Sequence, residues 1–191
     1  MILDRPSRAF VIAFGLAAAC GRDRPSEPAE SPLATEARAQ AALGPFKKSL
    51  QSALMGAMGD GGPEGAIEVC ATEAPRLAAL ASRDGVRVGR AALRRRNPEN
   101  LPPAWATPAL EELARSPADG AHRIVPLPGG RVGYVEAILT KPVCLTCHGE
   151  SVAPALRARI ATRYPHDEAT GFREGDLRGV FWAELPSPTT R

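Results

Sequence analysis

One five-residue segment, Cys144-Leu145-Thr146-Cys147-His148, constrains this 191-residue chain more than any other. It reads C-x-x-C-H, which is the attachment signature of c-type haem. In such a segment the two thiols add across the porphyrin vinyl groups as thioethers, and the adjacent imidazole becomes an axial ligand of the iron. The segment therefore predicts one covalent haem c, attached at Cys144 and Cys147, with His148 as a metal ligand.

Two other kinds of site share this spacing, a redox-active cysteine pair and half of a zinc site. A zinc site needs four nitrogen or sulfur ligands, and the chain has no second C-x-x-C and no H-x-x-x-H. A thioredoxin-like pair opens a helix after a buried strand, whereas this segment follows Lys141-Pro142 and is expected in a loop. Both alternatives explain the sequence less well than haem.

The N-terminus indicates export, which haem c attachment requires. Residues 1–8 are basic, and the apolar run of residues 9–19 is shorter than the roughly 20 residues that span a bilayer. The run ends in small residues directly before Cys20, a pattern that resembles a bacterial lipoprotein signal. We expect residues 1–19 to be the signal peptide and Cys20 to carry lipid, which anchors the protein on the periplasmic side of a membrane. An ordinary secretory signal is the alternative, and it also leads to export.

The fourth cysteine, Cys70, has no role in either pattern. It belongs to a segment that starts at Gly62-Pro63, where proline favours a helix start. Ile67, Cys70 and Ala74 recur at helical spacing, so the Cys70 side chain is predicted to point inward. Either it is a small buried hydrophobic residue or it is a thiolate ligand opposite His148, and spacing alone leaves both readings open.

Several motifs resemble one family of bacterial and cyanobacterial c-type haem domains, Tll0287-like in type. The resemblance covers roughly residues 40–186, with its motifs in the same order, and the family has a PAS-like fold and no assigned function. In that family a cysteine of the E-V-C-type helix is the second axial ligand, which implies that Cys70 and His148 both bind iron here. The motifs are Leu54-Met55-Gly56-Ala57, Ala66-Ile67-Glu68-Val69-Cys70, Glu73-Ala74-Pro75, Arg96-Asn97-Pro98-Glu99-Asn100, residues 144–149, residues 164–171 and residues 175–179.

Composition agrees with one domain of modest size. About 170 residues remain after the predicted signal, which is enough for a single core. The formal net charge of +3 is too small to indicate a nucleic-acid partner, and we expect none. Residues 20–37 are rich in Pro, Glu, Ser and Arg and are expected to be a flexible tether, and residues 38–188 are expected to form the haem-c domain.

The order of elements predicts an α+β fold, with helices first and then an antiparallel sheet that is PAS-like. Hairpin strands flank Gly129-Gly130, a turn signal, and helices group around them. Helices are expected over 35–58, from 63 onward, over 103–115 and over 152–163. Gly59-Asp60-Gly61-Gly62 is expected to end the first of them. Strands are expected over 86–93, 122–127, 131–139 and 178–185.

A few other residues carry weaker signals. His122 and His166 are possible iron ligands but are expected to be surface or structural histidines. Met55 and Met58 lie on an apolar helix face, which favours core packing over iron ligation. Arg96 either binds the haem propionates through forked hydrogen bonds or belongs to a solvated basic run with Arg94 and Arg95.

These features together favour redox sensing or low-potential electron transfer at the cell envelope. A thiolate opposite an imidazole fills both axial positions and favours ferric iron, so no open catalytic site is expected and no catalytic residue is assigned. A sensor or carrier of this size needs a redox or signalling partner protein to read it. One alternative is a sensor of nitric oxide or carbon monoxide in which Cys70 is displaced, and another is a peroxidase or reductase, for which no distal histidine pattern is evident.

Overall fold

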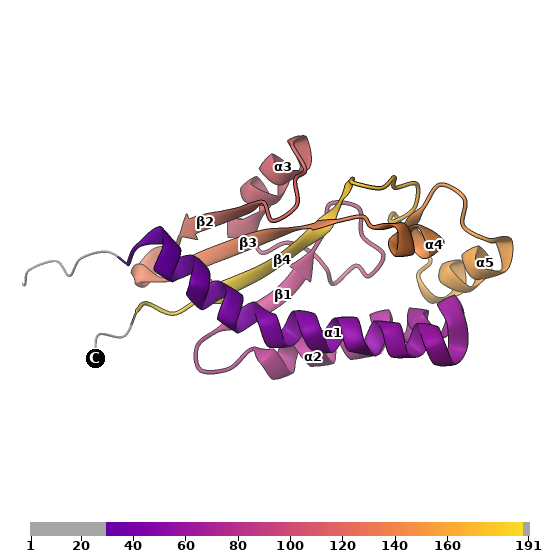
Figure 1. The fold of residues 1–191 in the computed structure, drawn as a ribbon, viewed down its shortest axis with the longest axis horizontal. Helices are drawn as coiled ribbons and strands as arrows, with labels where there is room; N and C mark the ends of the chain where they lie inside the picture. The colour runs from indigo at the N-terminus through magenta and orange to yellow at the C-terminus, as the bar shows by residue number, and fades with distance from the viewer. Residues whose placement is uncertain (1–29, 189–191) are drawn as a thin grey trace, which may run out of the picture.

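The computed structural model describes residues 30–188, and this part of the chain forms four strands and five α-helices. The strands form one antiparallel sheet in the order β1-β4-β3-β2, with helices against both faces (Figure 1). The α+β class with an N-terminal helix and an antiparallel sheet is therefore confirmed. The strands are β1 (Arg87–Ala91), β2 (His122–Pro126), β3 (Val132–Leu139) and β4 (Leu177–Leu185), and the helices are α1 (Pro32–Glu68), α2 (Ala74–Ala81), α3 (Thr107–Arg115), α4 (Leu145–His148) and α5 (Pro154–Arg163).

The first helix, α1, begins earlier than the sequence indicated. The Ser31 side chain caps it by accepting a hydrogen bond from the Ala34 N–H at 3.2 Å. Residues 32–37, which composition assigned to the tether, are helical, and Thr35 is 3% exposed. A polar composition in the first turns of a helix that packs along one side is easily mistaken for a linker, because only every third or fourth residue is buried.

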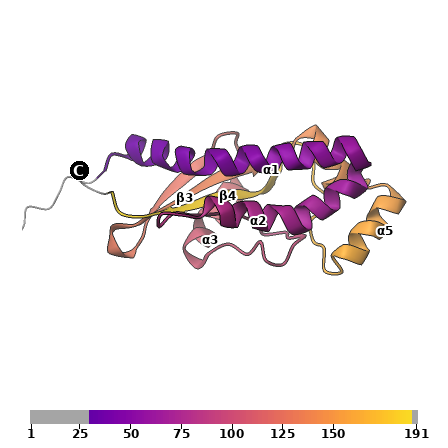
Figure 2. The ribbon, with the colours of Figure 1, turned by 90° about the horizontal axis from the view of Figure 1, so that it is seen from below.

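Gly62 interrupts α1 where the sequence predicted a helix end. Its φ of 62° and ψ of −163° lie outside the helical region, in a conformation that glycine adopts readily. Pro63 then restarts the helix, so that α1 consists of a long arm and a short returning segment. The chain continues through a five-residue π-helical turn, Val69–Glu73, into α2. In Figure 2 the long arm of α1 lies beside the returning chain that leads into α2, and the two join at the end of the molecule next to α5.

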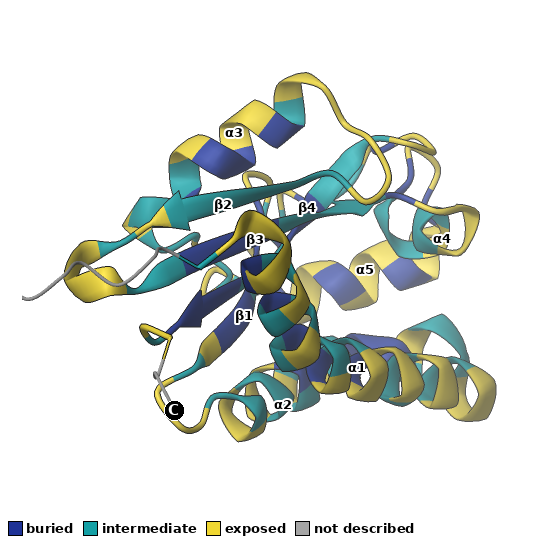
Figure 3. Ribbon diagram, turned by 60° about the vertical axis from the view of Figure 1, so that its left-hand side comes forward, coloured by how far each residue is buried: buried dark blue, intermediate teal, exposed yellow. Residues whose placement is uncertain are grey.

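The sheet separates two apolar cores. On one face Tyr134 and Ala183 contact the α1 residues Leu43 and Phe46, and on the other face Val135 and Val180 contact α3. Tyr134 and Val135 are successive residues of β3, so the two cores follow the two-residue period of a strand. Figure 3 shows α3 on one side of the sheet and α1 with α2 on the other.

The β2–β3 connection is longer than the sequence suggested. Pro126 pairs with Val132, and the Leu127 N–H donates to the Arg131 carbonyl at 2.9 Å, so residues 127–131 form the loop. Both Gly129 and Gly130 have a φ of 70°, which is why glycines occupy this turn.

A third apolar cluster lies beyond the end of the sheet, around α5. Leu156, Ile160 and Tyr164 pack there against Ile67 of α1, with Cys147 at the edge. The segment that carries the C-x-x-C-H motif therefore lies between the sheet and the returning arm of α1. Within residues 30–188 no helix combines the length and the apolar character needed to cross a bilayer.

Candidate functional site

A cavity of about 230 Å³ lies at this end of the sheet and collects the predicted site residues. Cys70, Arg96, Cys144, Cys147 and His148 all line it, although up to 78 positions separate them in sequence. The rest of the wall is mostly apolar. It consists of Leu54, Met55, Met58, Ala66, Ile67, Arg90, Ala91, Ala92, Asn97, Asn100, Ile138, Val143, Tyr164, Arg178 and Gly179.

The C-x-x-C-H motif forms one helical turn rather than the loop that was expected. A 3-10 turn over Pro142–Cys144 leads into α4, and the Gly149 N–H closes the turn on the Leu145 carbonyl at 2.9 Å. Residues three apart in a helix share a face, so Cys144 and Cys147 point to the same side. Both are free, partly buried thiols, and burial raises the pKa of Cys147. The turn presents two thiols toward the cavity.

His148 has one ring nitrogen occupied by the protein. Its Nδ1 lies 2.6 Å from the Ala169 carbonyl oxygen, which can only accept, so Nδ1 carries the proton. Burial, together with the positive charges of the nearby Arg178 and Arg96, lowers the pKa of His148 to about 2. The ring is therefore neutral, and Nε2 keeps its lone pair. The Phe172 ring stands edge-on to the imidazole, with the ring centres 6.4 Å apart.

Arg96 holds the backbone around the motif. Its Nε and Nη2 each lie 3.1 Å from a carboxylate oxygen of Asp167, and Nη2 also donates to the Cys147 carbonyl at 2.6 Å and to the Ala169 carbonyl at 3.3 Å. Asp167 in turn accepts from the Ala169 N–H at 2.9 Å. This network fixes the carbonyl to which His148 donates. Arg96 lines the cavity, but most of its donors are engaged, and its predicted contact with propionates stays a prediction.

Cys70 faces the cavity from the π-helical turn. Its neighbours Ile67 and Ala71 pack against the cluster around α5, while Cys70 itself is partly exposed to the cavity. Single π-helical turns occur often at functional sites, where the extra residue re-aims one side chain. The inward orientation predicted from helical spacing is therefore present, and the thiol shares one cavity with His148.

The weaker candidates divide into two groups. Met55 and Met58 line the cavity, and Met55 is 50% exposed, so the expectation that Met55 packs in the core is wrong. His122 stacks on Tyr134 at 5.3 Å, away from the cavity wall, and His166 is exposed. Neither histidine lines the cavity, which agrees with the surface or structural roles expected for them.

Two arginines on the wall were not identified from sequence as site residues. Arg90 comes from β1 and Arg178 from the second position of β4, and burial lowers the pKa of both, that of Arg178 to about 10. Strand alternation places Arg90 on the same face as Val88, but which strands adjoin the cavity depends on the register. Tyr164 also lines the cavity. Its hydroxyl is buried without a partner in the described part of the chain, and burial raises its pKa to about 12.

The residues present suit a haem. Two thiols on one helical turn, an imidazole with a free Nε2 and a further thiol surround a cavity whose wall is largely apolar. Among the described lining residues there are three arginines and no Asp or Glu, which suits a ligand with carboxylate groups. The predicted lipidation site, Cys20, lies outside the described residues.

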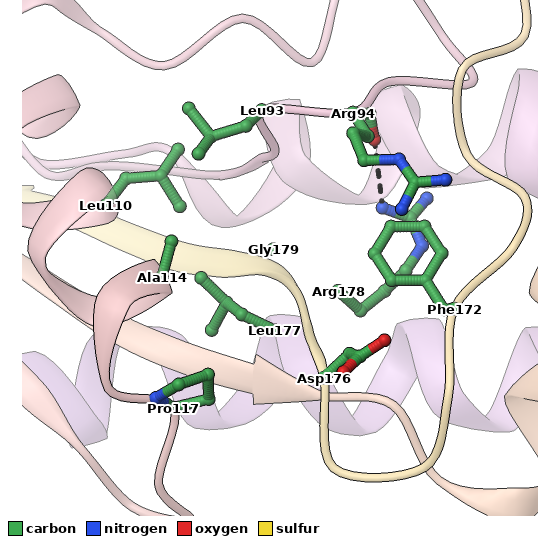
Figure 4. Close-up of a pocket in the computed structure, with 10 residues that line it drawn as sticks. All are labelled: Leu93, Arg94, Leu110, Ala114, Pro117, Phe172, Asp176, Leu177, Arg178 and Gly179. Atoms are coloured by element: carbon green, nitrogen blue, oxygen red, sulfur yellow. Dashed lines mark hydrogen bonds between the residues drawn. The ribbon is translucent and has the colours of Figure 1, made fainter.

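A second cavity of about 250 Å³ adjoins the first (Figure 4). Arg178 and Gly179 line both, while Leu110, Ala114 and Leu177 form the apolar side of the second. Its described lining residues include no thiol and no imidazole. The cavity with the four candidate ligand side chains is therefore the candidate site.

Comparisons with known proteins agree with this assignment. The family model described as Tll0287-like matches residues 23–186. Among solved structures, the cyanobacterial haem protein Tll0287 is 33% identical, with a TM-score of 0.50, over 64% of this chain and 74% of that one. No curated protein matches the chain. Because the family match extends over most of the sequence, the chain belongs to the Tll0287-like family.

Proposed function

We propose that the chain binds one haem c covalently at the cavity around Cys144, Cys147 and His148. Each thiol S–H adds across a vinyl C=C of the porphyrin, with hydrogen going to one carbon and sulfur to the other, so nothing leaves. His148 supplies Nε2 as an axial ligand, and the Ala169 carbonyl keeps the ring in the tautomer that this requires. The family relation to a haem protein supports this proposal.

Cys70 supplies the second axial ligand in this proposal. The single observation that carries it is that Cys70 and His148, 78 positions apart, line the same cavity. A thiolate brings negative charge to the metal and stabilises the ferric over the ferrous state, so the reduction potential is expected to be low. Arg90 lies close enough to Cys70 for their charges to interact, and the two charges attract.

The function that follows is redox sensing or low-potential electron transfer. A haem bound here supplies one-electron chemistry at its iron. With His148 and Cys70 both engaged, the protein offers no open position to a substrate, which favours a redox or sensing role over an enzymatic one. The signal or electron passes to a partner protein. In this proposal the chain is exported and held at the periplasmic face of a membrane through lipid on Cys20.

Optical spectra of the haem-loaded, full-length protein test this proposal. We expect a six-coordinate, low-spin ferric spectrum and a ferrous spectrum that carbon monoxide leaves unchanged, because the protein fills both axial positions. A ferrous form that binds carbon monoxide tightly would instead support the gas-sensing alternative, with Cys70 as the displaced ligand. A ferric form that is high-spin and turns over peroxide would support an enzyme.

A further inference from the structure

The cavity wall carries unbalanced positive charge. Three arginines line it, Arg90, Arg96 and Arg178, and the Arg96 charge is balanced by Asp167. Within residues 30–188 neither Arg90 nor Arg178 forms an ion pair with a carboxylate. The wall therefore includes two arginines that have no ion-pair partner in the described part of the chain.

Arg178 is only partly satisfied where it lies. Its Nη1 donates a long hydrogen bond, 3.4 Å, to the Arg94 carbonyl, and its guanidinium lies 5.3 Å from the centre of the Phe172 ring (Figure 4). Its Nε is buried and has no partner among the described residues. Burial and the neighbouring positive charges of Arg90 and Arg96 lower its pKa. A further acceptor is needed to complete its hydrogen bonding.

Arg90 is less satisfied still. In the described part of the chain its side chain makes no hydrogen bond, and burial lowers its pKa. Its strand places it beside Ala91 and Ala92, which also line the cavity. Tyr164 lines the same cavity, and its hydroxyl is buried without a partner in residues 30–188.

Such an arrangement is costly unless something anionic fills it. A buried cation without a counter-ion destabilises a fold by several kcal/mol, and a guanidinium is best matched by a carboxylate, which can accept two of its donors. The ligand must therefore carry carboxylates and an apolar body that suits the remaining wall. A porphyrin with two propionates has both.

We propose that Arg90 and Arg178 bind the carboxylate side chains of the porphyrin. Arg96 instead serves the backbone around His148, because its Nε and Nη2 already donate to Asp167 and to the Cys147 and Ala169 carbonyls. This inference rests on the proposed function, since it names the residues that hold the propionates of the same cofactor. It assigns the two arginines to cofactor binding and not to the stability of the sheet.

The test compares a porphyrin with and without its carboxylates. In the full-length chain carrying Cys144→Ser and Cys147→Ser, binding of metal-free protoporphyrin and of its dimethyl ester is followed by quenching of tryptophan fluorescence. Without metal or thioether bonds, the carboxylates become the main difference between the two ligands. We expect the acid to bind at least about tenfold more tightly than the ester, as for a charge-assisted hydrogen bond.

Substitution of the two arginines then locates the effect. Arg90→Gln with Arg178→Gln is expected to weaken binding of the acid about tenfold and to leave the ester unchanged, so the preference disappears. Lysine at both positions should restore part of the preference for the acid over the ester. The control Arg123→Gln removes an arginine from an exposed ion pair with Glu112 and should change neither affinity.

Four outcomes overturn the inference. Equal binding of acid and ester, or a preference that persists without both arginines, removes the carboxylate subsite and leaves haem binding intact. A folded variant that binds neither porphyrin removes the subsite as well, while a wild-type chain that retains no haem contradicts the proposed function itself. If the haem-free chain does not fold, resonance Raman spectra of the haem-loaded protein decide the matter, because the propionate bending band should shift in the double glutamine variant. An unshifted band would refute the assignment.

Discussion

Arg96 and Asp167 form a buried ion pair, and both partners also hold the residue to which His148 donates. The side chains are only 8% and 10% exposed, Nε and Oδ1 lie 3.1 Å apart, and both residues bond to Ala169. Because the Ala169 carbonyl accepts from His148 Nδ1, the pair helps to set the orientation of the imidazole. The ion pair thus supports the proposed ligand His148 through the Ala169 backbone.

Asp167→Asn should therefore change the metal site as well as the stability. Breaking a buried pair leaves Arg96 uncompensated, which costs about 3 kcal/mol in the free energy of unfolding. A weaker hydrogen bond from His148 to Ala169 also makes the imidazole a poorer donor to iron, so the reduction potential should rise. Urea unfolding and redox titration measure the two effects. Lys47→Gln, which breaks a partly buried pair with Glu136 away from the cavity, should leave the potential unchanged.

Covalent attachment should depend on both motif thiols. Denatured wild-type protein made with a cytochrome c maturation system should stay coloured and gain the mass of one haem. Cys144→Ala or Cys147→Ala should retain at most one thioether and lose haem more easily. Haem that extracts completely from the wild type into acidified organic solvent would show that the bond is not covalent.

The haem-free protein should lose stability as the pH falls below about 6.5. Burial lowers the pKa of His148 to about 2 from its ordinary 6.5, so at intermediate pH the unfolded chain binds a proton that the folded chain does not. The free energy of unfolding should fall by about 2.5 kcal/mol between pH 7 and pH 4.5 on account of this residue. His148→Asn removes the titrating group, and urea unfolding at several pH values should show a flatter dependence in that variant.

Lipidation should take place at Cys20. Wild-type protein should partition into detergent and carry a diacylglyceryl group visible by mass spectrometry, while Cys20→Ser should accumulate as an uncleaved precursor or become soluble. Wild-type protein found only in the soluble periplasmic fraction would rule out the lipid anchor and leave an ordinary secretory signal.

Local signals in the sequence account for much of this fold and site. The stop at Gly59-Asp60-Gly61-Gly62 and the restart at Pro63 are visible because glycine and proline act on the backbone directly. The C-x-x-C-H motif is also visible in the sequence, because all of its residues are neighbours along the chain. The inward direction of Cys70 follows from helical period, but its meeting with His148 does not.

What the sequence could not provide depends on how distant segments meet. Arg90 and Arg178 become site residues only because the sheet register brings the ends of β1 and β4 to the cavity. Arg96 reads as part of a basic run until Asp167, 71 positions away, is placed beside it. Met55 reads as a core residue because helical period cannot distinguish a core from a cavity wall.

The central claim is that Cys70 and His148 are the two axial ligands, and the ferric spectrum of Cys70→Ala tests it most directly. Wild-type protein should show a low-spin ferric electron paramagnetic resonance signal with thiolate character. Without the thiolate, water or an added ligand should enter, so the signal should become high-spin or ligand-dependent and the reduction potential should rise. A Cys70→Ala protein with an unchanged ferric signal and an unchanged potential would contradict the account, and Met55 and Met58 on the same cavity wall would then be the ligands to test.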